Sequence, residues 1–315
     1  MRALTIAQRR LEVLERPTPK PGPHDVLVEV RSAGINAADL MQREGLYPAP
    51  PGWPVDVPGM ELAGVVTAVG DRVVEPLLGR RVCTVVGGGA QATHCVVPSE
   101  HLLFLPDHVS FEEAGGFPEA FITAYDALVS QGRLASGQRV LISGAAGGVG
   151  AAGVQIAHVL GAEVIAVTRT NEHHARLRAL GADETITVDE VGAIEPVDVV
   201  LELLGAAHLD VAQRVLNPFA RVVVIGVGAG RNAQVDLLIL MTKRATLTGS
   251  TLRTRSREEK AEVTRRVGDA LVPRWSEHEL AVPLAKVFAL DSAEEAYAFF
   301  ATPGKFGKVV LRVDA

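Results

Sequence analysis

The sequence predicts an α/β protein in which a doubly wound parallel sheet is inserted into a domain with a mixed sheet. Apolar strands alternate with helices through the middle of the chain, whereas short strands broken by Pro and Gly fill about the first hundred residues. Similar short elements return near the C-terminus. We therefore predict that residues 118–271 form the inserted domain, and that residues 1–117 and 272–315 fold together.

The composition is that of a folded protein and excludes several classes. Of 315 residues, 48% are hydrophobic and 22% charged, and the formal net charge is −6. A negative net charge does not favour binding to the phosphate backbone of nucleic acid. The chain has 2 cysteines, so a disulfide scaffold is excluded and a reducing compartment is favoured. Neither a secretion signal nor a long apolar run is present, so we expect a cytoplasmic protein with no membrane partner.

The first part of the chain predicts short strands and one short helix. The strands share an alternation of apolar and polar residues, as in a half-buried sheet. They are expected at Asp25–Val30, Leu62–Val69 and Gln91–Val97. The side chain of Asn36 can cap a helix that runs through Met41, and the Pro-rich segment Tyr47–Pro58 is expected to be a loop.

After Phe117, strands and helices alternate. Pro118 fits the first turn of a helix that covers Ala120–Val129. Apolar strands are expected at Arg139–Ser143, Glu163–Thr168, Val197–Leu201, Arg221–Ile225 and Ala245–Gly249. Helices are expected at Gly147–Leu160, Asn171–Leu180 and Leu209–Leu216. Uniformly apolar strands separated by helices predict a parallel sheet covered on both faces.

The last part of the chain predicts a long polar helix and a return to short elements. The helix covers Ser256–Leu271, and it is followed by a strand at Lys286–Ala289, a helix at Ala293–Phe300 and a strand at Lys308–Val313. The strand Ala245–Gly249 should lie at the open edge of the parallel sheet. An exposed edge is a template for a second strand, so we expect a homodimer.

A glycine-rich turn lies where a dinucleotide site is expected. The residues Ser143–Gly144–Ala145–Ala146–Gly147–Gly148–Val149–Gly150 follow a strand and open a helix. Small residues there permit a tight turn, approach of a pyrophosphate and packing of helix on strand. The pyrophosphate would lie on the positive end of the helix. We predict a Rossmann domain that binds the cofactor through Ala146, Gly147, Gly148, Val149 and Gly150. The alternative is a turn that only packs helix on sheet.

The end of the second predicted strand favours NADP(H). Thr168, Arg169 and Thr170 lie there, and the first acidic residue, Glu172, is already inside the helix. An Asp or Glu at this point would bind the ribose 2′-hydroxyl of NAD. A guanidinium with flanking hydroxyls would instead attract a 2′-phosphate. The alternative is an exposed loop arginine that holds no ligand.

Several short motifs spread along the chain form a specific combination. They are Asn36–Arg43, Gly45, Tyr47, Pro50–Gly52, Pro118–Ala120, Thr123–Ala124, the glycine-rich turn, Gly249–Arg253 and Gly307–Leu311. Together they resemble the zinc-independent quinone oxidoreductases of the medium-chain dehydrogenase/reductase superfamily, the zeta-crystallin group, and in particular its p53-inducible branch. The resemblance covers essentially the whole chain, and it implies a GroES-like catalytic domain around the Rossmann domain.

The resemblance implies that quinone and nicotinamide meet in the cleft between the domains. Asn36 and Tyr47 would line the acceptor side, and Thr123 would contact the nicotinamide ribose region. The other positions implied are Gly226 and Val227, whose backbone would meet the carboxamide, and Lys308 near the cofactor. The structural alternatives are that Asn36 only caps its helix, that Tyr47 only packs its loop and that Thr123 only bonds its own helix backbone.

The zinc alcohol dehydrogenases of this superfamily need a Cys ligand and a Gly-His-Glu motif. Here no Cys lies near Asn36, and the motif reads Gly59–Met60–Glu61, so we expect no metal. The resulting hypothesis is an NADPH-dependent reductase of quinones. The alternatives are an NADPH-dependent reductase of activated carbon–carbon double bonds in enals or enones, and a non-catalytic dinucleotide-binding or crystallin-like protein.

Overall fold

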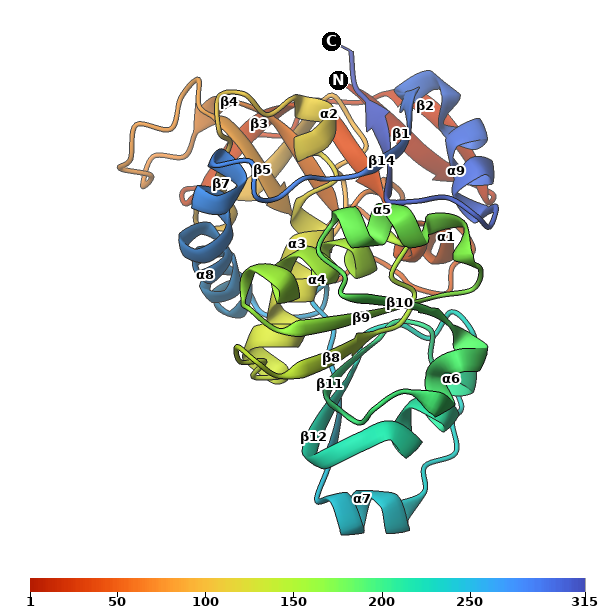
Figure 1. Ribbon diagram of the computed structural model, residues 1–315. Coiled ribbons are helices and arrows are strands. Elements are labelled where there is room, and N and C mark those ends of the chain that lie inside the picture. The colour runs from red at the N-terminus through yellow and green to blue at the C-terminus, as the bar shows by residue number, and fades with distance from the viewer. Residues whose placement is uncertain (315) are drawn as a thin grey trace. The chain divides into compact units, whose positions relative to one another are not determined.

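The computed structural model describes residues 1–314 and divides into two compact units (Figure 1). The first unit comprises Met1–Ile122 and the chain from Leu252 to its described end, and the second comprises Thr123–Thr251. The second unit is thus inserted into the first, at boundaries of 122/123 and 251/252 in place of the predicted 117/118 and 271/272.

Helix α8 (Arg257–Ser276) accounts for most of the difference in boundaries. It falls within the predicted inserted domain, residues 118–271, but it packs on η1 (Ser99–His101) and β7 (Leu103–Phe104) of the first unit. Its buried face includes Val263, Val267 and Leu271, and these apolar side chains need the first unit's core to cover them.

The second unit contains a six-stranded parallel sheet in the order β10-β9-β8-β11-β12-β13. The strands are β8 (Arg139–Ile142), β9 (Glu163–Thr168), β10 (Glu184–Thr187), β11 (Val197–Glu202), β12 (Leu216–Val224) and β13 (Thr246–Gly249). The strand order reverses between β8 and β11, which is where ligands bind in doubly wound sheets.

Helices and short 3-10 or π segments connect the strands of the second unit. They are the end of α3 (Pro118–Tyr125), η2 (Asp126–Gln131), α4 (Gly148–Val159), η3 (Asn171–His173), α5 (His174–Ala179), η4 (Val188–Ala193), α6 (Ala206–Ala212), η5 (Gln213–Val215) and α7 (Leu237–Lys243). Leu209 and Ala212 of α6 join a core with Leu141 and Val200 of the sheet. On the other face, Gly153 of α4 lies against the side chains of Ile142 and Leu201. The sheet is therefore covered on both faces, as predicted.

One region of the second unit differs from the sequence prediction. The predicted helix Leu209–Leu216 ends earlier, and β12 begins at Leu216 rather than Arg221. Phe219 has a positive φ of 64°, and the pairing of β11 with β12 shifts register near it. A strand that contains a proline and such an irregularity lacks the alternation by which strands are recognised.

The first unit contains a two-stranded antiparallel sheet and a seven-stranded mixed sheet. The small sheet pairs β1 (Arg2–Ala7) with β2 (Arg10–Glu15). The order of the large sheet is β14-β15-β3-β4-β5-β7, and β6 also pairs with β3. Its strands are β3 (Asp25–Ile35), β4 (Glu61–Val69), β5 (Arg81–Val85), β6 (His94–Pro98), β7, β14 (Leu284–Ala289) and β15 (Lys308–Arg312). Since β15 pairs antiparallel with β3, the two ends of the chain share one sheet.

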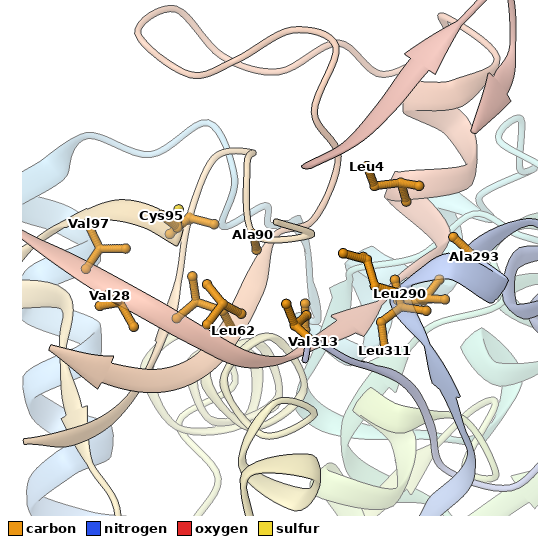
Figure 2. Close-up of a cluster of buried hydrophobic side chains, with 14 of the residues drawn as sticks. Leu4, Val28, Leu62, Ala90, Cys95, Val97, Leu290, Ala293, Leu311 and Val313 are labelled. Atoms are coloured by element: carbon orange, nitrogen blue, oxygen red, sulfur yellow. The ribbon is translucent and has the colours of Figure 1, made fainter. Parts of the chain in front are cut away.

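The core of the first unit brings side chains from both ends of the chain together. Figure 2 shows Leu4, Val28 and Leu62 in one cluster with Leu290 and Leu311. Besides η1, the helices of this unit are α1 (Ala37–Arg43), α2 (Phe111–Ala114), the first part of α3, α8, η6 (Leu290–Ser292) and α9 (Ala293–Ala301). The two cysteines, Cys83 and Cys95, are buried and free.

Candidate dinucleotide-binding loop and polar cluster

The glycine-rich turn joins β8 to α4 and leaves the start of α4 open. Gly147 is exposed and is the N-cap residue, so no side chain caps the helix. The nearest atom to a Cβ at Gly147 would be the Gly144 oxygen at 3.4 Å, whereas a Cβ at Gly150 would lie 2.4 Å from that oxygen. Gly150 therefore allows the helix to pack on the turn, and Gly147 leaves room for a ligand. This turn fits a dinucleotide pyrophosphate.

The other residues of the turn are half-buried or buried. Ala146, Gly148 and Val149 are half-buried at the start of α4. Ala145 is buried, and its N–H donates to the Val167 oxygen of β9 at 3.0 Å. Ala145 stands where the dinucleotide fingerprint has its first glycine, and its small side chain lets the turn approach the neighbouring strand β9.

A buried polar network holds the turn at residues 203–205, which follows β11. The sequence did not predict this network. The Ser143 hydroxyl donates to Glu202 Oε1 at 2.9 Å and accepts the Leu203 N–H at 2.7 Å. Glu202 also accepts the Gly205 N–H at 2.9 Å and contacts His208 Nδ1. Burial acts to raise the pKa of Glu202, but the contacts with His208 and the turn outweigh it and lower that pKa.

Gly226 and Val227 lie against this turn. A Cβ at Gly226 would meet the Leu203 oxygen at 2.3 Å, so only glycine allows the two turns to approach. The Gly226 N–H donates to the Glu202 backbone oxygen at 3.2 Å, and Val227 is 50% exposed. Both predicted residues therefore lie at the carboxyl edge of the parallel sheet. Their role toward a carboxamide stays a prediction.

The end of β9 presents a cation beside a polar cavity. Thr168 is buried, and its hydroxyl donates to the Thr170 oxygen at 2.8 Å. Arg169 is exposed and makes no ion pair within residues 1–314. The adjacent cavity, of about 580 Å³, is lined by Thr170, Asn171, His174, Thr185, Thr187 and Glu190.

Thr123 is buried in α3, and its hydroxyl has no hydrogen-bond partner in the part of the chain that the structure describes. The structure therefore differs from the alternative in which this hydroxyl only bonds its own helix backbone. A buried hydroxyl without a partner is uncommon and fits a group that awaits a ligand.

In the first unit, residues distant in sequence form what we call the polar cluster: Asn36, Glu61, Glu119 and Lys308. Lys308 Nζ lies 2.5 Å from Glu61 Oε1 and 2.6 Å from Asn36 Oδ1. Asn36 Nδ2 donates to Glu61 Oε1 at 2.9 Å, and the Glu119 N–H donates to Glu61 Oε2 at 2.9 Å. Glu61 is 0% exposed and Lys308 4%. The side chain of Asn36 thus belongs to the cluster, and its backbone N–H donates to Asp39 Oδ2 in the capping box at the start of α1.

Two carboxyl groups have raised pKa values here, Asp39 beside the cluster and Glu119 within it. Asp39 is fully buried and accepts the N–H groups of Asn36 and Gly59. Burial nevertheless raises the pKa of Asp39 to about 6. Burial also raises the pKa of Glu119 to about 8, and the charge of Glu61 adds to the effect.

Tyr47 packs on Arg253, a residue that the sequence analysis did not select for the site. The Arg253 guanidinium lies 5.0 Å from the centroid of the Tyr47 ring, and Nη1 donates to the backbone oxygen of Tyr47 at 3.1 Å. Arg253 also donates to the Gly87 oxygen and to Gln42 Oε1. The structure thus brings Asn36 and Lys308 into contact and places Tyr47 on a separate buried arginine.

The residues where a catalytic zinc would bind do not fit the metal. Met60 is buried and offers only a thioether, and the Asn36 amide is engaged by Glu61 and Lys308. Within residues 1–314, no three His, Cys, Asp or Glu side chains gather as a metal site requires.

None of the helices within residues 1–314 combines the length and the apolar character needed to cross a membrane. The cytoplasmic location stays a prediction.

Comparison with family models agrees with the fold of each unit. The model described as "Alcohol dehydrogenase GroES-like domain" matches residues 22–130, and the one described as "Zinc-binding dehydrogenase" matches residues 148–268. The predicted fold class, a Rossmann sheet inserted into a mixed-sheet GroES-like domain, is confirmed.

Curated relatives have two kinds of name. The chain is 37% identical over 227 residues to the rat (Rattus norvegicus) synaptic vesicle membrane protein VAT-1 homolog, which covers 69% of the chain and 56% of that protein. The chain therefore spans little more than half the length of this relative. It is 32% identical over 305 residues to a quinone oxidoreductase-like protein 2 homolog from Nematostella vectensis, covering 92% of the chain and 82% of that protein.

Solved structures match both units. The quinone oxidoreductase of Thermus thermophilus, whose structures include a complex with NADPH, has a TM-score of 0.86 and 33% identity and covers 99% of this chain and 100% of its own. An alcohol dehydrogenase superfamily protein from Novosphingobium aromaticivorans has a TM-score of 0.88 and 29% identity and covers 100% of both chains. From these matches and the geometry above, the chain belongs to the medium-chain dehydrogenase/reductase superfamily and has quinone oxidoreductase-like relatives.

Proposed function

We propose that the protein is an NADPH-dependent quinone reductase that works without metal and belongs to the zeta-crystallin group of its superfamily. The observation that carries the proposal is the polar cluster, in which an amide and an ammonium occupy the region where zinc enzymes hold their metal. Quinones and enones accept negative charge on oxygen when they are reduced. The positive charge of the Lys308 ammonium can stabilise such charge through its field, so a Lewis acid is not required.

In this proposal the second unit holds the cofactor. The open start of α4 would bind the pyrophosphate, and the residues Thr168–Thr170 would bind the 2′-phosphate. The unpartnered Thr123 hydroxyl and the backbone of Gly226 and Val227 would orient the nicotinamide. When bound, the cofactor supplies a hydride, and the protein supplies orientation and charge. Asn36 and Tyr47 lie in the unit that would hold the acceptor.

The runner-up is reduction of activated carbon–carbon double bonds in enals or enones. It uses the same residues, and it needs a proton donor because hydride addition to carbon leaves an enolate. The raised pKa of Glu119, about 8, favours such a donor. The third alternative, a binding protein without catalysis, is consistent with relatives whose names refer to a synaptic vesicle membrane and to no reaction.

The test is consumption of NADPH by the purified protein with a panel of quinones and a panel of 2-alkenals, each assayed with and without a metal chelator. Turnover of quinones that the chelator leaves unchanged would support the proposal. Turnover of alkenals alone would establish the runner-up. Cofactor binding without turnover of any acceptor would favour the binding protein, and stoichiometric zinc that is removed together with activity would contradict metal-free catalysis.

Replacing Arg169 with Ala is expected to weaken NADPH binding about ten- to hundred-fold and to leave NADH binding nearly unchanged. A charge-assisted hydrogen bond to the 2′-phosphate is worth roughly 1.5–3 kcal/mol, which gives this range. Titration of both cofactors by fluorescence measures the two affinities. Arg178→Ala is the matched control, because Arg178 is another exposed arginine, on α5. Equal affinity of the wild type for NADH and NADPH would refute the preference for NADP(H).

We also propose a homodimer that pairs through β13, the edge strand of the parallel sheet. Leu247 on β13 is 36% exposed, and Leu237, Leu238 and Met241 of α7 are 66–72% exposed. An unpaired edge strand together with exposed apolar side chains from the same unit fits a second copy of the chain related by a two-fold axis.

Light scattering at micromolar concentration should therefore give the mass of a dimer, and Leu238→Asp should shift the mass toward a monomer. Val74→Asp is the control, because Val74 is 89% exposed and lies in the other unit. A monomeric wild type, or a dimer that Leu238→Asp and Leu247→Lys both leave intact, would contradict this interface.

A further inference from the structure

Three acidic side chains lie within one buried region of the first unit, and only one of them is left without a partner. Glu61 contacts Lys308, Asn36 and the Glu119 N–H, and Asp39 accepts two backbone N–H groups. The carboxyl of Glu119, by contrast, makes no hydrogen bond or ion pair within residues 1–314. This carboxyl is therefore available to water or to a ligand.

Glu119 is also accessible, unlike its neighbours. Glu61 is 0% exposed and Asp39 is 0% exposed, whereas Glu119 is half-buried in the first turn of α3. Its backbone N–H is fixed by Glu61, so the residue is held in place while its carboxyl stays open. This combination of a fixed backbone and a free carboxyl suits a group that must contact a ligand.

Burial, together with the charges around it, raises the pKa of the Glu119 carboxyl. Burial is the main cause, and the negative charges of Glu61 on β4 and Asp39 on α1 add to it. The positive charges of Lys308 on β15 and Arg253 oppose it, and Lys260 on α8 is also close enough to interact. The balance raises the pKa of Glu119 to about 8, near the working pH that an efficient general acid needs.

We propose that Glu119 is the catalytic acid that delivers a proton to the reduced acceptor. This inference rests on the proposed function. A quinone gains a hydride, with its two electrons, from the bound nicotinamide, which is oxidised, and the quinone becomes a hydroquinone monoanion. The O–H bond of Glu119 then breaks as an O–H bond forms on the hydroquinone oxygen. For an enone, the same proton goes to the α-carbon of the enolate.

The position of Glu119 also allows its carboxylate to be protonated again after the transfer. After transfer, Glu119 is a carboxylate, and its half-exposed position lets solvent protonate it again. Lys308 lies in the same cluster, where Glu61 and Asn36 hold its Nζ. Its positive charge lowers the cost of this transient negative charge. Atoms and charges therefore balance with NADPH, the acceptor and one proton from water.

The test compares the pH dependence of kcat in wild type, Glu119→Gln and Glu119→Asp. In the wild type, kcat should fall as the pH rises above about 8, because the acid form is lost. Glu119→Gln cannot donate an acidic proton, so kcat should fall by about a hundred-fold or more and the basic limb should disappear. Glu119→Asp should recover part of the rate, while NADPH affinity stays near wild type in both variants. Glu112→Gln, on the neighbouring helix α2, is the matched control.

Stability separates this role from a structural one. The pKa of Glu119 is raised from 4.5 to about 8 in the folded protein, so stability falls as the pH rises from 4.5 to 8. Glu119→Gln should therefore be at least as stable as the wild type at pH 9. A variant that unfolds there, or one that keeps both wild-type kcat and the basic limb, would overturn the inference. A wild type that reduces no acceptor would instead refute the proposed function on which it rests.

Discussion

Replacement of Lys308 by Met is expected to lower the free energy of unfolding by about 3–5 kcal/mol, the largest stability loss that we predict for a single side chain. Lys308 and Glu61 are both buried, and their charged atoms lie 2.5 Å apart. Without the ammonium, the buried Glu61 carboxylate keeps two donors within residues 1–314, Asn36 Nδ2 and the Glu119 N–H. An uncompensated buried charge costs more than the lost attraction itself.

Urea unfolding at neutral pH measures this loss. The double variant Lys308→Met/Glu61→Gln should recover much of it, because the buried charge is then absent from both sides of the pair. Arg274→Met provides the control, since Arg274 pairs with Glu279 at the surface and such pairs contribute about 0–1 kcal/mol. A loss no greater than that of the control would show that Glu61 does not depend on Lys308.

Replacement of Gly150 by Ala is expected to abolish cofactor binding and to destabilise the second unit. The added Cβ would lie 2.4 Å from the Gly144 oxygen and 2.6 Å from the Ala145 Cα, and both are backbone atoms that cannot rotate away. The turn and the start of α4 must therefore separate. We expect the Kd for NADPH and NADH to rise by about a hundred-fold or more, equivalent to roughly 3 kcal/mol.

Gly147→Ala tests the two glycine roles separately. Its Cβ would meet only the Gly144 oxygen, at 3.4 Å, and its φ of −76° is open to any residue. Folding should be unaffected, whereas the close approach of a pyrophosphate should be hindered. Thermal unfolding and cofactor titration report the two effects, and Gly192→Ala is a neutral control because its nearest contact would be 3.8 Å away. Wild-type affinity in Gly150→Ala would show that this turn does not hold the cofactor.

The fold could be predicted where its signal is local. The strand β9 has the predicted bounds, Glu163–Thr168, because a run of apolar residues ends at a helix on each side. In contrast, β12 contains Pro218 and the left-handed Phe219, and no local pattern identifies such a strand. The short strands β1, β2, β5 and β10 were also missed, because their burial depends on partners elsewhere in the chain.

The dinucleotide loop could be predicted because its glycines are contiguous, but the polar cluster could not be assembled from spacing. Glu61 and Lys308 are 247 positions apart, and only the folded sheet brings β4 and β15 to the same region. The signal that was available is the acid of Gly59–Met60–Glu61, a charged residue next to apolar neighbours. Buried charges are paired, so that acid implied a cation somewhere in the chain without saying which one.

The pairing of β15 with β3 also constrains how the chain acquires its structure during synthesis. The inserted unit, Thr123–Thr251, leaves the ribosome with all its strands, whereas residues 32–35 of β3 wait for β15, about 270 residues further along the chain. Contacts of such long sequence separation form slowly. Until β15 is made, β3 presents an open edge on which other chains can pair. We therefore expect the inserted unit to become protease-resistant first on the nascent chain, and the danger of aggregation to concentrate in the unit that surrounds it.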